Sequence, residues 1–135
     1  MHTDEPRETQ QTRAVLGPVT LTFPADSRMA RVARLAATAL GSVAGFTVDD
    51  NDDLRIAVDE LIVMCIEGGD GAEVTMRFSI ADRAVTVEAE TAAARASSDP
   101  EQFMMSEQIL GVVTDSYRVA TEGQRLTAGF TKTAS

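Results

Sequence analysis

The sequence of 135 residues, with 44% hydrophobic and 24% charged residues, is ordinary for one compact globular domain. Its formal net charge of −9 argues against a nucleic-acid-binding protein, because phosphate contacts require clustered lysine and arginine. One cysteine and one histidine in the whole chain argue against an internal disulfide, a cysteine-based zinc cluster and a histidine-based catalytic triad.

The sequence carries no sign of a membrane-spanning segment or of a secretory signal. No apolar run is long enough to cross a bilayer, and the N-terminus lacks a basic segment followed by an apolar core. We therefore expect a cytoplasmic protein without a membrane partner. Residues 1–16 are polar and have no periodicity, which predicts a flexible tail before a single domain that spans residues 17–135.

A strand and a helix are predicted after the tail. Residues 19–23 alternate apolar side chains with threonine, which is typical of a half-buried strand, and Pro24 closes it. Asp26 or Ser27 is expected to cap a helix that runs to about Val43. Helical spacing predicts its buried stripe as Met29, Val32, Ala33, Ala36, Leu40 and Val43.

Three arginines share a side of this helix. Arg28, Arg31 and Arg34 are three residues apart and are expected to point away from much of the buried stripe. The simpler interpretation is an outer face in contact with water, and the alternative is a basic contact surface for an acidic partner.

The next helix is predicted to end at Gly68-Gly69 and to begin in a cluster of aspartates at positions 49, 50, 52 and 53, where negative charge complements the helix dipole. The cluster lacks the glycine and the terminal glutamate of an EF-hand, so we predict no metal site. The acidic pair Asp59-Glu60 lies inside the apolar run of the helix, an unusual position for charge. Cys65 is expected to be a small buried apolar residue.

The second half of the chain predicts two hairpins and a helix. Alternating residues between 74 and 89 form the first hairpin around a turn at 81–83, and residues 117–131 form the second around 122–124. Between them we expect a surface loop over residues 91–99 and a helix that begins at Pro100. The order of elements predicts an α+β fold, a two-layer α/β sandwich with helices on one face of a mostly antiparallel mixed sheet.

The order of elements and the run Asp53 to Glu60, DLRIAVDE, together resemble the RsbW-like anti-sigma factors. These are small serine protein kinases of the GHKL, or histidine kinase-like ATPase, superfamily. The resemblance covers most of the chain from about Val19 and implies the Bergerat fold. A weaker match at Ala30-Arg31-Val32 falls where relatives place an arginine that contacts the partner. The resemblance therefore implies a partner-binding surface with Arg31 at its centre, beside Arg28 and Arg34.

The resemblance also implies a nucleotide site, with Glu60 in the position of the general base. Four residues later, on the same side of the helix, relatives carry an asparagine that holds Mg²⁺, and this chain carries Met64. A thioether is a soft ligand that does not replace an amide oxygen on a hard cation. The metal-holding position has therefore been lost.

Two further motifs of the nucleotide site depart from the family pattern. Glu88 or Glu90 stands near the place of an adenine-contacting aspartate, but alanines follow where the family has spaced glycines. In the stretch from Met105 to Gly111, only Gly111 remains of a glycine-rich turn that covers the phosphates. ATP and Mg²⁺ are cofactors only if a site built from Glu60, Met64, Glu90 and Gly111 still functions.

We therefore hypothesise an anti-sigma regulator that binds and sequesters a sigma factor, is countered by an anti-anti-sigma protein and does not transfer phosphate. The resemblance also implies a homodimer. The alternative is an active ATP-dependent serine protein kinase that phosphorylates an anti-anti-sigma factor, with Glu60 as general base. Nothing in the residues separates sigma binding from a regulatory contact of some unrelated kind.

Overall fold

The computed structural model describes residues 15–94 and 99–135. The elements in chain order are β1 (Leu16–Pro24), the short 3-10 helix η1 (Ser27–Met29), α2 (Ala30–Val43), α3 (Val48–Gly68), β2 (Gly69–Ala81), β3 (Ala84–Ala93), α4 (Pro100–Val113), β4 (Ser116–Glu122) and β5 (Arg125–Thr133). The tail expected at residues 1–16 lies outside the described residues as far as position 14, and Leu16 already begins β1.

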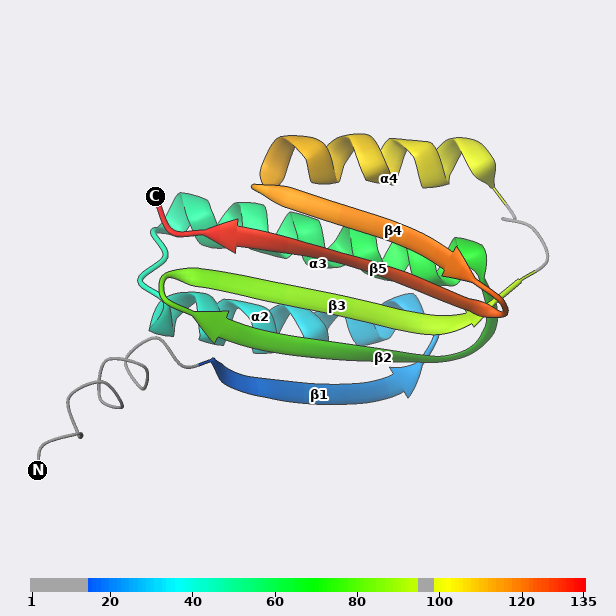
Figure 1. The fold of residues 1–135 in the computed structure, drawn as a ribbon, viewed down its shortest axis with the longest axis horizontal. Coiled ribbons are helices and arrows are strands. Elements are labelled where there is room, and N and C mark those ends of the chain that lie inside the picture. Colours follow the sequence, from blue (N-terminus) through cyan, green and yellow to red (C-terminus); the bar gives the residue numbers. More distant parts are fainter. Residues whose placement is uncertain (1–14, 95–98) are drawn as a thin grey trace, which may run out of the picture.

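The strands form one five-stranded sheet in the order β1-β2-β3-β5-β4, and α2, α3 and α4 cover one of its faces (Figure 1). All four pairings are antiparallel, so within the described strands the sheet is antiparallel throughout rather than mixed. The predicted α+β two-layer sandwich is confirmed. The other face of the sheet carries no helix of the described chain and is called the open face below.

The core lies between the sheet and the helices. Successive side chains of a strand point to opposite faces, so every second residue of each central strand reaches the helix layer. These inward residues are Val74, Met76, Phe78 and Ile80 on β2, Val85, Val87, Ala89 and Thr91 on β3, and Leu126, Ala128 and Phe130 on β5. The predicted alternation of both hairpins is therefore confirmed.

The start of α3 is fixed by a capping box. The Thr47 hydroxyl accepts the Asp50 N–H at 3.1 Å, and the Asp50 carboxylate accepts the Thr47 N–H at 3.0 Å. Asp50 is buried and also accepts the hydroxyl and the N–H of Ser135, at 2.6 and 3.1 Å. These hydrogen bonds hold the pKa of Asp50 well below its usual range, and the bond from the Ser135 hydroxyl has the largest effect. Asp50 therefore joins the α2–α3 connection to the chain beyond β5.

The buried side of α2 differs from the predicted stripe. Its buried positions are the small residues Ala30, Ala33, Ala37 and Gly41, whereas Val32 and Val43 are exposed. A Cβ on Gly41 would collide with Asn51 Oδ1 and lie 3.0 Å from atoms of Leu54 and Phe46. The close approach of α2 to α3 leaves room for small side chains only, which turns the larger ones outward.

β3 includes the first residues of the surface loop predicted at residues 91–99. β3 continues to Ala93, and Thr91 is buried, where its hydroxyl donates to the Glu73 carbonyl oxygen at 2.6 Å. Residues 95–98 lie outside the described chain, and Asp99 caps α4 by accepting the Gln102 N–H. None of the described helices is both long enough and apolar enough to span a membrane.

Candidate functional site

The solvent side of α2 carries an apolar stripe next to a positive charge. Val32, Leu35 and Val43 are exposed, with 64% of Leu35 and 67% of Val43 accessible to water. Arg31 is one helical turn before Leu35, so the two side chains lie on the same side of α2. We call Arg31, Val32, Leu35 and Val43 the α2 surface.

The three arginines proposed from the sequence have different surroundings. Arg28 forms an ion pair with Asp26 at 2.6 Å, and this hydrogen bond lowers the pKa of Asp26 to about 2. Arg34 bridges to Asp59 of α3 at 2.8 Å, which ties the two helices together. Arg31 is exposed and has no ionic or hydrogen-bonded partner in the described part of the chain. Arg31 is therefore the arginine of this helix with its charge available to another molecule.

Glu60 and Met64 lie on one side of α3, as their spacing of four residues requires. Met64 is fully buried among the apolar core residues, so its sulfur has no open path to a hydrated cation. Glu60 is half-buried, and its Oε1 atom is buried without a hydrogen-bond partner among the described residues. The helix thus places a half-buried carboxylate beside a buried thioether, which is a poor ligand for a hard cation such as Mg²⁺.

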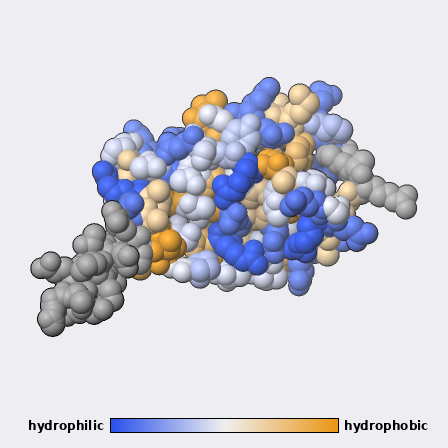
Figure 2. Space-filling model, in the orientation of Figure 1, coloured by the Kyte–Doolittle hydropathy of each residue, from blue (hydrophilic) through white to orange (hydrophobic). Residues whose placement is uncertain are grey.

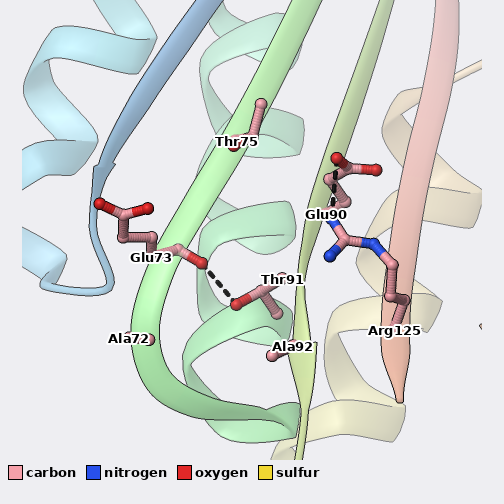
Figure 3. A pocket seen from close by; sticks show the side chains of 7 residues that line it. All are labelled: Ala72, Glu73, Thr75, Glu90, Thr91, Ala92 and Arg125. Atoms are coloured by element: carbon pink, nitrogen blue, oxygen red, sulfur yellow. Dashed lines mark hydrogen bonds and ion pairs between the residues drawn. The ribbon is translucent and has the colours of Figure 1, made fainter.

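Glu90 lies on the open face of the sheet, away from Glu60 and the helices. It accepts hydrogen bonds from Arg125 at 2.8 Å and Arg77 at 3.3 Å. Although burial by itself raises the pKa of Glu90, the bonds from Arg77 and Arg125 lower it overall. Figure 3 shows Glu90 and Arg125 reaching toward each other in a shallow pocket of about 320 Å³, with α3 behind the strands.

The alternation of β3 explains why Glu90 does not meet Glu60. Val85 and Val87 point to the helix layer, so Glu88 and Glu90 point to the open face, and the inward positions at that level are Ala89 and Thr91. A β3 side chain that contacts a ligand held beside Glu60 must come from those two positions. The alternation of apolar and polar residues along β3 can be seen in the sequence, and it would have identified Ala89 and Thr91 as the inward positions.

Gly111 lies on the exposed side of α4, and a Cβ built on it would be 3.6 Å from Tyr117 Cε1. The four residues expected at the nucleotide site are therefore not assembled: Glu60 and Met64 share α3, and Glu90 lies on the other face of the sheet. Across residues 15–94 and 99–135, no three His, Cys, Asp or Glu side chains are grouped to hold a metal ion. Among the described residues, these four positions therefore do not form a single nucleotide site.

No family model matches the sequence, and a search of curated proteins finds no significant match. The structure is similar to a solved structure of the RsbU and RsbW domains of Rv1364c from Mycobacterium tuberculosis, with a TM-score of 0.66 and 17% sequence identity. The similarity covers 87% of this chain and 32% of that chain, so the protein spans about a third of the length of its structural relative. An identity this low establishes a shared architecture. The chain therefore has a two-layer α/β sandwich of the kind found in a protein that contains an RsbW domain.

Proposed function

We propose that the protein is an anti-sigma regulator that sequesters a sigma factor through the α2 surface and does not transfer phosphate. The observation that carries this proposal is the exposed Arg31, which has no ionic or hydrogen-bonded partner among residues 15–94 and 99–135, beside exposed Leu35. Arginine next to apolar side chains is a common composition for the centre of a protein interface. The fold similarity supports the proposal, although a fold alone does not determine a function.

The α2 surface favours a partner that combines acidic and apolar side chains. A carboxylate can bind the planar guanidinium of Arg31 through two parallel hydrogen bonds, and apolar groups of the partner would cover Leu35 and Val43. Binding of this kind would block the region of the sigma factor that lies against α2, so that RNA polymerase could not use it. An anti-anti-sigma protein would release the sigma factor by competing for the same surface.

Charge reversal at Arg31 tests the partner surface. Each sigma factor encoded in the genome of the source organism is purified, and its affinity for the protein is measured by calorimetry. We expect one to bind, and Arg31→Glu to weaken that binding by roughly 30-fold, since hot-spot residues contribute about 2 kcal/mol or more. The matched control is Arg125→Glu on the open face, where Glu90 keeps Arg77 as a partner. Equal affinity of Arg31→Glu and wild type, or no binding sigma factor, would refute the proposal.

A separate calorimetric titration with ATP and Mg²⁺ tests whether the protein binds the nucleotide that phosphoryl transfer requires. Glu60, whose buried Oε1 has no hydrogen-bond partner among the described residues, is the observation that favours a kinase, whereas buried Met64 and outward-facing Glu90 argue against one. We expect calorimetry with ATP and Mg²⁺ to show no binding at millimolar nucleotide. Micromolar binding would contradict this part of the proposal and leave the sigma-binding part intact.

A further inference from the structure

The two edges of the sheet differ in how they are protected. At the β1 edge, Pro18 and Pro24 have no N–H to donate, and the register shifts between Leu16 and Val19. β4, at the opposite edge, pairs with β5 over seven consecutive residues without a proline or a register shift. Proteins usually block edges of this second kind because they present unpaired backbone groups to other chains.

The hairpin between β4 and β5 determines which backbone groups of β4 are free. Its two-residue turn makes Glu122 and Arg125 a hydrogen-bonded pair, and such pairs alternate along an antiparallel ladder. The Ala93 N–H donates to the Gln124 carbonyl oxygen, so even-numbered residues of β5 bond to β3 and odd-numbered ones to β4. It follows that Tyr117, Val119 and Thr121 direct their N–H and C=O groups to the outside.

The free edge is flanked by α4, a helix that is apolar on both sides. Phe103 and Leu110 pack inward, whereas Met104 and Val112 are 60% and 83% exposed. Figure 1 shows α4 alongside and outside β4, and Figure 2 shows apolar patches between polar ones along this edge. A Cβ built on Gly111 would lie 3.6 Å from Tyr117 Cε1, so α4 closely approaches the start of β4 at this point. An extended chain paired with β4 would place every second side chain against α4.

The charges at this edge favour a basic occupant. Glu101 and Glu107 lie on α4, which has no basic residue, and Glu122 ends β4 without an ion pair in the described part of the chain. The positive charge of Arg118 is offset by Glu88, which it contacts at 2.8 Å. An extended segment with a lysine or arginine near Glu122 would therefore complement the edge electrostatically.

We propose that the β4 edge and the exposed side of α4 bind an extended, basic segment of a partner protein, which adds a sixth strand to the sheet. A second copy of this chain fits less well. Because α4 lies outside β4, two-fold pairing of two β4 edges would bring the second α4 onto the first (Figure 1). Two copies would also repel each other, since each carries a net charge of −9. This site lies at the β4 edge of the sheet, whereas α2 lies toward the β1 edge, so the site is separate from the α2 surface.

A library of linear twelve-residue peptides displayed on phage tests the proposal. We expect enriched peptides to alternate apolar residues with polar ones and to carry lysine or arginine. The discriminating variant is Thr121→Pro, which removes an N–H that points to the free edge and has no partner in the sheet. Loss of that backbone bond should weaken peptide binding by about tenfold, while the control Thr121→Val, which keeps the N–H, should bind as wild type does.

Three results would overturn the proposal. They are the absence of enriched peptides, equal binding of those peptides to Thr121→Pro, and a wild-type dimer in sedimentation that Thr121→Pro abolishes. The last result would assign the edge to a second copy of the chain. Circular dichroism establishes that Thr121→Pro is folded. If it is not, Met104→Lys replaces it, because Met104 is exposed, the change leaves the core intact, and the new positive charge would repel a basic segment. Peptides that bind Met104→Lys as tightly as wild type would then contradict the proposal.

Discussion

α2 and α4 lie on opposite sides of α3 and pack against the same face of the sheet, but they are held differently. α2 faces the core with Ala33, Ala37 and Gly41, and its larger side chains point to water. α4 faces the core with Leu110 and half-buried Phe103. Small inward residues bring α2 close to its neighbours, whereas α4 has larger inward side chains and an exposed glycine.

The neighbouring sheet edges extend this contrast. Beside α2, the prolines of β1 close the backbone edge, so side chains such as Arg31 and Leu35 are what that side offers a partner. Beside α4, the β4 backbone is open and the helix offers exposed apolar side chains together with acidic ones. The first side therefore suits the surface of a folded partner, and the second suits an extended strand.

The largest effect is expected at the connection that leads from α2 into α3. Asp50→Ala removes the buried carboxylate that accepts three hydrogen bonds, one from Thr47 and two from Ser135. This change should lower the free energy of unfolding by about 2–3 kcal/mol. Urea denaturation measures this loss. The corresponding change at α4, Asp99→Ala, removes an exposed cap and should cost about 0.5–1 kcal/mol. Equal losses would mean that the two helices are anchored equally well.

The same Asp50 variant carries a pH test. Because the pKa of Asp50 is lowered in the folded protein, its stabilising effect is fully present above the unfolded pKa of about 3.9 and is lost as the pH falls below it. The difference in unfolding free energy between wild type and Asp50→Ala should therefore shrink as the pH is lowered from about 5 to about 2. A difference that stays constant across this range would contradict the assigned hydrogen bonds.

Alanine in place of glycine should have opposite effects in the two helices. Gly41→Ala forces Asn51 and Leu54 to move, and we expect a loss of about 1–2 kcal/mol after the gain in helix propensity is included. Denaturant titration of the purified variant measures the change. A stabilised Gly41→Ala would show that α2 and α3 are packed less closely than the structure indicates.

Gly111→Ala should instead stabilise the protein by about 0.5–1 kcal/mol. Its new methyl group meets Tyr117 at an ordinary distance of 3.6 Å, and alanine reduces the freedom of the unfolded chain. The midpoint of thermal unfolding, measured side by side with Gly41→Ala, should rise. A lower midpoint would mean that the junction of α4 and β4 is already filled.

The smallest effect is expected at the ion pair between Arg34 and Asp59. Both side chains are more than a third exposed, so Asp59→Asn should cost less than about 0.5 kcal/mol. The unfolding free energy at low and high salt measures this contribution. A loss above about 1 kcal/mol would show that charge pairing, rather than the small residues of α2, holds that helix in place.

Much of the fold was predictable because it depends on neighbours in the chain. The alternation of Val85 and Val87, the glycines after α3 and the turn between β4 and β5 are local signals, and the structure bears them out. The resemblance carried by residues 53–60 indicated the two-layer sandwich, which the fold similarity also supports. The element order followed from these segments together.

The candidate site was less predictable because it depends on what each segment faces. Val32 and Val43 were expected in the core, but α3 approaches α2 too closely for them, and alanines occupy the inner side. Glu90 was expected beside Glu60, but strand parity turns it to the open face, where Arg125 binds it. In both cases the residue was correctly located in its element, and its direction was wrong.

The sequence by itself determined which segments are helices and strands, since periodicity, caps and turn residues act over a few positions. It also identified Arg31 as a candidate contact. Arg28 pairs locally with Asp26. Only the tertiary structure decided that Arg34 is paired whereas Arg31 has no such partner among the described residues. The acid that pairs with Arg34, Asp59, is 25 residues away along the chain, and long-range contacts of this kind depend on how α2 packs against α3.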